Sequence, residues 1–453
     1  MTEAGEEHGW QVSLLVPHPT RLAVLVGDSG PSSSVWRLPT LRTGPEPPLA
    51  EIMASVDAVD PETSVPLRLS MSTAQADGVE IALVLEFDAV AAAAAPAGWA
   101  WRDLDAETIA RLEPADARAA VSSWTRERVD GWEPLRPVWS RPGWFARASA
   151  WMLDQMAAAG CPATGAPRVH YLWGVSVVLR APSSNGDFFL KCSGDIFRQE
   201  AITTRRLAAH MPEVFPEVVA VDATQGWLLM GDLDAPELGE QDESLWHSGL
   251  VIYSGIQRTW QGRTDELVDL GLAVRSLTAL AEEVGEISDD DVLQSRMDSE
   301  LRDRWRSSAP SLARACLRLE EIGPGPSLVH GDLHPWNVTY GSGKTRIFDW
   351  TDAAVSHPFV DLATYIFRTD DVALRRRMVD AYLDAWSTVG SVDRLREAVD
   401  LAVVVGSLYQ VQTFRVLIPT LMNQGADDDL ADGDLSWIRR TLTRLEHGLD
   451  SPS

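Results

Sequence analysis

At 453 residues the chain is too long for one ordinary hydrophobic core, so we expect two or three domains. Apolar residues make up 45% of it and charged residues 23%, which is typical of a soluble globular protein. The net charge of −27 argues against non-specific affinity for nucleic acid or anionic membrane, since both are polyanions. The charge would suit a cationic substrate, although a well-solvated acidic surface is the simpler interpretation.

The three cysteines are widely spaced and predict neither a disulfide framework nor a metal site, which fits a reducing compartment. The first ten residues are acidic and polar, unlike a signal peptide. The apolar run at 89–97 is far too short to cross a bilayer. We therefore expect a cytoplasmic protein.

The first 90 residues are predicted to be rich in β-structure. Apolar segments at 11–16 and 21–26 flank a Pro-His-Pro-Thr turn, which predicts a hairpin. Further strands are expected at 34–38 and 80–87, and the Pro- and Gly-rich stretch at 39–48 is expected to be irregular. From 105 to 128 apolar residues recur at the helical period, and Pro114 is expected to separate two helices.

The segment 131–142 is rich in Pro, Gly and Trp and is predicted to be an ordered linker that holds a domain boundary. A helix is then expected at 143–159, followed by a hairpin whose strands, 175–180 and 188–191, flank a polar turn. A helix at 199–210, strands at 218–221 and 226–230, and mostly helices thereafter complete the prediction, with short strands at 328–329 and 346–348. The acidic run at 427–429 is interpreted as a solvated loop. The predicted domains are 1–140, 141–233 and 234–453.

One segment carries a pattern that points to chemistry: Val-His-Gly-Asp-Leu-His-Pro-Trp-Asn-Val at 329–338. It places Asp332 and Asn337 five residues apart, as in the catalytic loop of protein kinases, and Asp349 follows at the end of the next strand. In phosphoryl transfer one carboxylate orients the attacking hydroxyl and accepts its proton, while another carboxylate and an amide oxygen bind Mg²⁺ against the phosphates. Each residue alone could merely cap a turn, but the combination indicates a phosphotransferase.

These motifs resemble those of the aminoglycoside phosphotransferase and choline kinase family, whose fold is similar to that of protein kinases. The matching segments are His-Gly-Asp with Asn337, Ile-Phe-Asp-Trp at 347–350, and His-Pro with Asp-Leu-Ala at 357–363. The resemblance implies an α+β, bilobal protein-kinase-like fold, with a small β-rich N-lobe and a larger helical C-lobe, preceded by a small β-rich α+β domain. It implies that Asp332 is the catalytic base, that Asn337 and Asp349 bind Mg²⁺, and that ATP is the phosphate donor.

The resemblance also implies residues that support the loop or bind the nucleotide. His330, His334 and Asp361 would brace the catalytic loop; the histidines are not taken as a metal pair, because a kinase of this type binds its metal through oxygen ligands. Lys191, at the end of a strand, would bind the α- and β-phosphates, and Glu200 in the following helix would orient it. The alternatives are a surface lysine and a glutamate placed by the helix dipole. Adenine would bind backbone groups of Met230, Gly231, Asp232 and Leu233.

The acceptor is expected between the catalytic loop and the C-terminal helices, as in the family. Candidate wall residues are Tyr365, Arg368, Asp370, Asp371, Asp384 and Trp386. Carboxylates beside an aromatic ring suit a sugar or amino sugar, and antibiotic and choline-like acceptors stay open. The same residues could equally form a solvated helix face.

Two alternatives belong to other classes of protein. A nucleotide-binding regulator without catalysis is disfavoured because Asp332, Asn337 and Asp349 are all present. A protein kinase would have a long activation segment after its metal-binding aspartate, whereas only 350–357 precedes Pro358 here. We therefore predict an ATP- and Mg²⁺-dependent phosphotransferase that acts on a hydroxyl of an aminoglycoside, amino sugar or sugar, with the silent regulator as the alternative.

Overall fold

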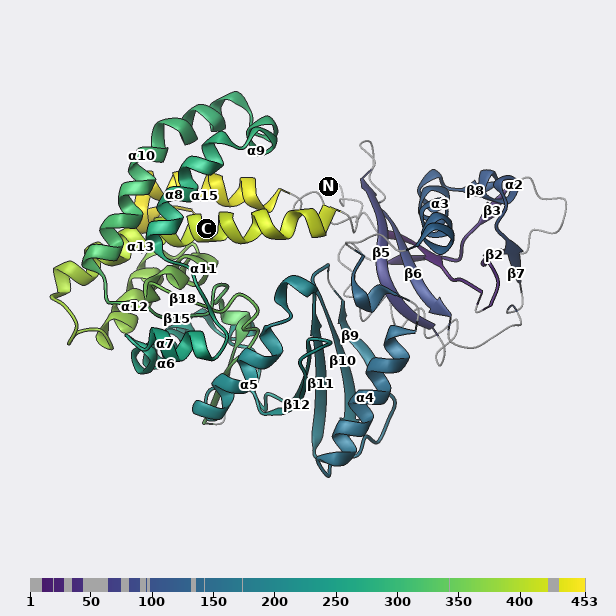
Figure 1. The fold of residues 1–453 in the computed structure, drawn as a ribbon, viewed down its shortest axis with the longest axis horizontal. Coiled ribbons are helices and arrows are strands. Elements are labelled where there is room, and N and C mark those ends of the chain that lie inside the picture. Colours follow the sequence, from purple (N-terminus) through teal and green to yellow (C-terminus); the bar gives the residue numbers. More distant parts are fainter. Residues whose placement is uncertain are drawn as a thin grey trace, which may run out of the picture. The chain divides into compact units, whose positions relative to one another are not determined.

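The computed structural model describes residues 10–18, 20–27, 35–43, 64–74, 81–89, 95, 98–131, 136–141, 143–172, 174–341, 343–422 and 432–452 (Figure 1). The chain forms two compact units, and each is described by itself. The first comprises Met1–Gly194 and Leu417–Ala431, and the second comprises Asp195–Val416 and Asp432–Ser453. The predicted boundaries at 140/141 and 233/234 stay predictions, and the acidic run at 427–429 lies outside the described residues.

The first unit begins with a four-stranded sheet in the order β4-β1-β6-β5. Its strands are β1 (Trp10–Leu15), β4 (Thr40–Thr43), β5 (Ser64–Ala74) and β6 (Ile81–Ala89). β1 runs parallel to β6 and antiparallel to β4. The predicted strand at 80–87 is therefore confirmed, whereas the stretch expected to be irregular, 39–48, contains β4.

The predicted hairpin between the first two segments forms only next to its turn, as far as the described residues show. There the Pro17–Val24 bridge is flanked by backbone hydrogen bonds from His18 to Ala23 at 2.8 Å and from Leu25 to Val16 at 3.0 Å. Along its length β2 (Ala23–Gly27) pairs with β7 (Trp99–Asp103) instead of β1. The short β3 (Trp36–Arg37) pairs with β8 (Leu112–Glu113). The reason is that β1 already has a partner on each edge, β4 and β6, so it has no edge left for β2.

The two predicted helices form on either side of Pro114. Asp105 caps α2 (Ala106–Ala110) by accepting a hydrogen bond from the backbone N–H of Thr108 at 2.7 Å. α3 (Ala115–Asp130) buries Ala117, Val121 and Trp124, which recur at the helical period. These side chains pack with apolar residues of β2, β3 and β8 to form the core of this region.

After the linker come α4 (Trp144–Ala158) and an antiparallel meander of β9 (Arg168–Leu172), β10 (Ser176–Ser183) and β11 (Gly186–Ser193). Ser183 pairs with Gly186, so the hairpin closes through the two-residue turn predicted from the sequence. Gly186 has φ of 109°, which suits glycine. The expected helix and hairpin are thus both confirmed.

The second unit starts with α5 (Glu200–His210) and the antiparallel strands β12 (Val218–Asp222) and β13 (Trp227–Gly231). Helices then dominate. The longer ones are α6 (Trp246–Trp260), α8 (Leu277–Asp289), α10 (Ser299–Ile322), α12 (Val372–Asp384), α13 (Val392–Met422) and α15 (Gly433–His447). They share one large apolar core in which Trp305, Trp350 and Tyr253 are fully buried.

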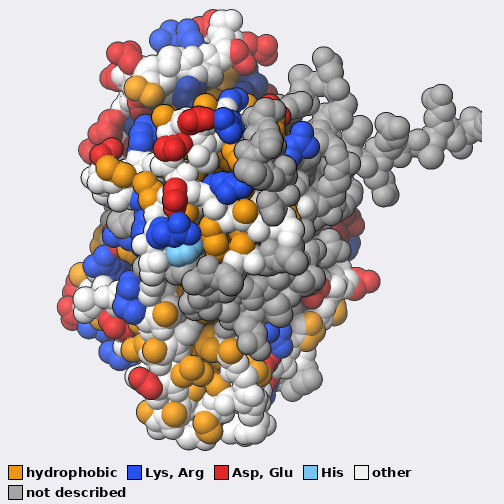
Figure 2. Space-filling view, turned by 90° about the vertical axis from the view of Figure 1, so that its right-hand side faces the viewer, with side chains coloured by type: hydrophobic (Ala, Val, Ile, Leu, Met, Phe, Trp, Pro, Cys, Tyr) orange, Lys and Arg blue, Asp and Glu red, His pale blue; other side chains and the backbone are white. Residues whose placement is uncertain are grey.

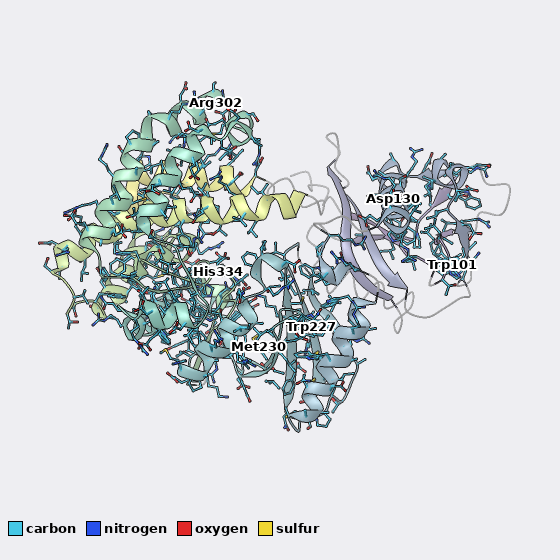
Figure 3. The ribbon with its side chains drawn as sticks, in the orientation of Figure 1. Trp101, Asp130, Trp227, Met230, Arg302 and His334 are labelled. Atoms are coloured by element: carbon cyan, nitrogen blue, oxygen red, sulfur yellow. The ribbon has the colours of Figure 1, made fainter. Side chains whose placement is uncertain are left out.

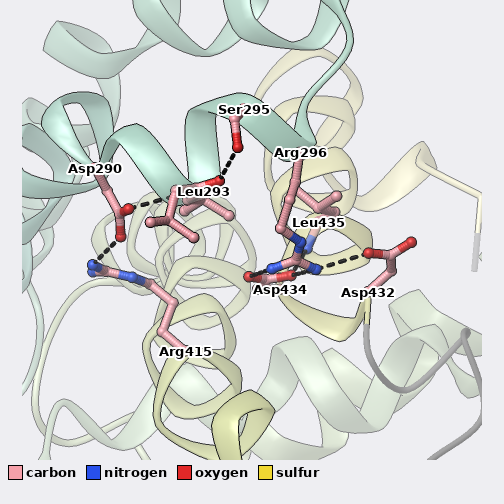
Figure 4. Close-up of polar contacts among 9 residues, drawn as sticks. Asp290, Leu293, Ser295, Arg296, Arg415, Asp432, Asp434 and Leu435 are labelled. Carbon is pink, nitrogen blue, oxygen red and sulfur yellow. Dashed lines mark hydrogen bonds and ion pairs between the residues drawn. The ribbon is translucent and has the colours of Figure 1, made fainter. Parts of the chain in front are cut away.

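Charged side chains join the last helix to the rest of this unit (Figure 4). Arg296, at the end of α9 (Asp291–Arg296), pairs with Asp432 at 2.7 Å and with the buried Asp434 at 2.8 Å. Arg415 of α13 pairs with Asp290 at 2.9 Å. By length and composition, 392–418 of α13 is the one helix among the described residues that could span a membrane, and 72% of its most apolar window is buried in the structure, as in a core helix.

Five short strands position the motif at 329–338. β15 (Ser327–Val329) lies beside β18 (Ala354–Ser356), which also pairs with β14 (Ala273–Val274). β16 (Val338–Gly341) and β17 (Lys344–Ile347) form a hairpin. The loop 330–337 therefore runs from β15 to β16, and Asp349 follows β17.

Candidate active site

The hairpin of β16 and β17 brings the two predicted metal ligands together. Val338 pairs with Ile347, so Asn337 just before β16 lies opposite Phe348 just after β17. The backbone N–H of Phe348 donates to the carbonyl of Asn337 at 3.1 Å. Asn337 and Asp349, which the whole β16–β17 hairpin separates in the sequence, are thereby held at one end of that hairpin.

His330 ties the loop to the strand that carries Asp349. Its Nδ1 accepts a hydrogen bond from the backbone N–H of Asp332 at 3.3 Å, and its Nε2 lies 2.9 Å from the carbonyl oxygen of Phe348. This geometry requires the tautomer with the proton on Nε2. The ring is fully buried against Trp350, with the ring centroids 4.7 Å apart. His330 thus lies where a loop-bracing residue is expected.

Asp361, at the end of the 3₁₀ turn Pro358–Asp361, holds the same loop from the other side. Its buried carboxylate accepts hydrogen bonds from the backbone N–H groups of His330 at 3.0 Å and Gly331 at 2.9 Å, and from the hydroxyl of Tyr253. Burial raises the pKa of Asp361 to about 6, although these three donors oppose the rise. The carboxylate of Asp361 is hydrogen-bonded to the backbone of the loop, so Asp361 lies where a residue that braces the loop is expected.

Gly331 has φ of 87°, and a Cβ there would lie 2.4 Å from the carbonyl oxygen of Asp352. The side-chain amide of Gln410, on α13, donates to the carbonyl of Gly331. Sequence reasoning missed Gln410 and Tyr253. A signal for Gln410 was present, because it is a polar residue inside the apolar stretch 402–411.

Asp332 is the carboxylate of the loop that solvent can reach, with 43% of its side chain exposed. The dense protein around it raises its pKa, and Asp349 adds to the rise, whereas the positive charge of Arg368 and the nearby His330 oppose it. The side-chain amide of Asn337 donates to the backbone carbonyl of Asp332 at 3.0 Å. The carboxylate itself is therefore oriented by its backbone and stays available to a ligand.

His334, labelled in Figure 3, lies next to this carboxylate. Its Nε2 is 3.9 Å from Oδ2 of Asp332. Burial and, to a smaller extent, the charge of Arg368 lower the pKa of His334 to about 3. The ring is thus neutral at pH 7.

Trp336, between Pro335 and Asn337, is 38% exposed, and its ring lies on Gly239, where a Cβ would come within 2.4 Å of it.

The donor set of Asn337 and Asp349 fits Mg²⁺, which prefers carboxylate and amide oxygens. Asn337 uses its NH₂ group on Asp332, and among the described residues its side-chain oxygen accepts no hydrogen bond. Asp349 has the left-handed φ of 63°, a backbone conformation that is uncommon outside glycine and is concentrated at functional sites. One oxygen of Asp349 accepts a hydrogen bond from the Thr351 hydroxyl.

The predicted nucleotide residues occupy the expected elements. Lys191 lies in β11 and Glu200 opens α5, and both side chains are buried, at 7% and 4% exposure, which is unusual for a solvated lysine or glutamate. They belong to different compact units, and their pairing stays a prediction. Met230 and Gly231 end β13, and Asp232 and Leu233 follow (Figure 3).

The predicted acceptor residues divide into core and surface. Trp386 has no exposed surface and packs edge-on against Phe359, and Tyr365 is buried with its hydroxyl donating to the carbonyl of Trp246 at 2.7 Å. The expected stacking of a sugar on Trp386 is therefore wrong, because its ring has no free face. Asp384 and Asp370 are exposed, and so is Asp371, which caps α12 by accepting from the N–H of Leu374. Arg368 is exposed and is the candidate whose charge reaches Asp332.

Comparison with known proteins agrees with this geometry. Residues 177–397 match the model of the phosphotransferase enzyme family. This segment therefore belongs to that family, and the resemblance inferred from the loop motif is confirmed. So is the fold class, an α+β kinase-like phosphotransferase preceded by a β-rich region.

Similar solved structures are distant in sequence. One is the GDP complex of wild-type aminoglycoside 2'-phosphotransferase-IIIa, with 15% identity over 66% of this chain and 98% of that chain, at a TM-score of 0.49. Another is a choline/ethanolamine kinase family protein from Mesorhizobium loti, with 18% identity over 66% and 99% of the two chains, at a TM-score of 0.45. No curated protein sequence matches the chain.

Proposed function

We propose that this phosphotransferase-family protein transfers the γ-phosphoryl group of ATP to a hydroxyl of a small polar acceptor. The observation that carries the proposal is the hydrogen-bonded loop itself. Asp361 and His330 fix its backbone, and this leaves Asp332, Asn337 and Asp349 with side-chain oxygens around one end of the β16–β17 hairpin. A regulator without catalysis would not need Asp332 to be open to a ligand.

In this mechanism Asp332 orients the acceptor hydroxyl and takes its proton, and its raised pKa brings it closer to the working pH of a general base. Because His334 is neutral, it adds no positive charge beside the carboxylate of Asp332. Asn337 and Asp349 would hold Mg²⁺, which neutralises charge on the phosphates when bound. Lys191, oriented by Glu200, binds the α- and β-phosphates, and the backbone of 230–233 binds adenine. Catalysis then depends on positioning and charge stabilisation.

The test is phosphoryl transfer from ATP or GTP with Mg²⁺ to aminoglycosides, sugars, amino sugars and choline. Asp332→Asn keeps the shape of the side chain and removes the base, so turnover should fall by about 100-fold or more while binding of Mg²⁺·ATP is retained. Full activity of this variant would refute the assignment of Asp332. Tight nucleotide binding by the wild type without transfer to any acceptor would favour the regulator. Residence in the cytoplasm stays a prediction.

A further inference from the structure

Three arginines contact two aromatic rings of the second unit. The guanidinium groups of Arg375 and Arg444 lie 4.5 Å and 3.8 Å from the ring centroid of Phe367. Trp437, on α15, contacts Arg444 at 5.5 Å and Arg440 at 4.8 Å. The two rings hold these three cations together through cation–π contacts, and a fourth arginine, Arg368, follows Phe367 directly in the chain.

Little negative charge balances this cluster. Arg375 donates to the backbone carbonyls of residues 369, 449 and 451 and lies 3.6 Å from Asp370. Arg444 is only 3% exposed; it donates to the hydroxyl of Ser407, and its Nε has no hydrogen-bond partner. Within the described ranges, no carboxylate pairs with Arg368, Arg440 or Arg444.

The missing carboxylates are significant because a buried cation is costly without one. Burial and, to a smaller extent, the charges of Arg440, Arg375 and Arg368 lower the pKa of Arg444 to about 9. A purely structural arginine at this position would be expected to have an acidic neighbour, and this chain has 66 Asp and Glu residues to provide one. The positive charge of the cluster is therefore available to an anion that is not part of the chain.

Arg368 is anchored one turn beyond Thr364, in the segment that starts at Asp361. Its Nε donates to the carbonyl of Thr364 at 3.2 Å, and Asp361 itself binds the loop through the N–H groups of His330 and Gly331. In agreement with this placement, the charge of Arg368 lowers the pKa of Asp332, His334 and Arg440. Arg368 and Arg440 are both exposed, whereas Arg444 lies behind them. On the face that Figure 2 draws, basic and acidic side chains are interspersed.

We propose that the acceptor carries an anionic group, a carboxylate or a phosphate, which Arg368 and Arg440 bind while Asp332 engages its hydroxyl. The inference rests on the proposed function and names the substrate class of that site. Guanidinium groups suit both anions because they form paired, charge-assisted hydrogen bonds with them. A strongly cationic acceptor would be repelled by the same side chains.

The experiment compares acceptors that differ by one anionic group. Ethanolamine is paired with L-serine, which adds a carboxylate, and glucosamine with glucosamine 6-phosphate, which adds a phosphate. We expect kcat/KM to be about 10- to 100-fold higher for the anionic member of at least one pair. Arg440→Gln should remove most of that preference, because it should lower kcat/KM for the anionic member of the pair far more than for the member without the added anionic group. Arg439→Gln, which removes an exposed charge one residue away, should keep the preference.

The outcomes separate this inference from the proposed function. Transfer that depends on Asp332 but is as good for ethanolamine and glucosamine as for the anionic partners would overturn the inference and leave the kinase. If no acceptor is phosphorylated, low millimolar sulfate serves as the anion probe in thermal unfolding. A smaller sulfate-induced rise in Tm for Arg440→Gln than for the wild type and Arg439→Gln would support the site; equal rises in all three proteins would overturn it.

Discussion

Gly331 is held in a backbone conformation that an alanine could adopt only with strain. Its φ of 87° lies in the left-handed region, which costs a residue with a Cβ roughly 1–2 kcal/mol. In addition, the new Cβ would lie 2.4 Å from the carbonyl oxygen of Asp352, a backbone atom that cannot swing away. Overpacking of this kind costs about 1–3 kcal/mol. We therefore expect Gly331→Ala to lower the free energy of unfolding by about 2–5 kcal/mol.

Gly343→Ala is the matched control. Gly343 has φ of 73° but no atom within 4 Å of the position of its Cβ, so only the conformational cost of roughly 1–2 kcal/mol applies. Urea unfolding of both variants measures the difference, and phosphoryl transfer shows whether the displaced loop also misplaces Asp332. The Gly331 variant should lose activity and the Gly343 variant should keep it. Equal losses of stability in the two variants would refute the steric part of the reasoning.

Three further predictions concern charge. The pKa of Asp361 is raised to about 6 in the folded protein, so its contribution to stability is present below the pKa of the unfolded chain and is lost as pH rises through 6. Urea unfolding between pH 5 and 7.5 should therefore show a falling free energy of unfolding in the wild type and no such fall in Asp361→Asn. His334, with its pKa lowered to about 3, stays neutral over this range, so the pH–rate profile of His334→Gln should keep the wild-type shape, and a lost inflection near its usual pKa would contradict this. Arg296→Ala strands the buried carboxylate of Asp434 and should cost about 1–3 kcal/mol in urea unfolding, whereas Arg304→Ala, whose pair is largely exposed, should cost less than about 1 kcal/mol.

Local patterns predicted local structure well. The helical period from 105 to 128 identified α2 and α3, and the polar turn after Pro182 identified the β10–β11 hairpin. β5 was missed although Val65, Leu67, Leu69 and Met71 alternate with other residues, a pattern typical of a strand. The pairing of β1 with β6 could not be predicted, because it joins segments that are far apart in the sequence and nothing in either strand specifies its partner.

The candidate site divides in the same way. Asp332, Asn337 and Asp349 fall within twenty residues, so their spacing in the sequence was enough to predict that they share a site. Gln410, Arg440 and Arg444 come from helices that begin more than fifty residues beyond the loop. Tertiary packing brings Gln410 to Gly331 and Arg444 to Phe367, and the sequence does not specify either contact. Trp386 was misassigned because an aromatic residue near charged ones has the same sequence pattern whether its ring faces a ligand or the core.

Trp336 gives the loop a built-in spectroscopic reporter. The chain has 18 tryptophans, and among the described ones Trp336 combines substantial exposure with a position inside the loop itself, directly before Asn337. Indole emission responds to solvent contact, so a nucleotide or acceptor that covers this ring would shift its fluorescence. The difference between the emission of the wild type and that of Trp336→Phe would then follow occupancy of the loop without any label and without turnover.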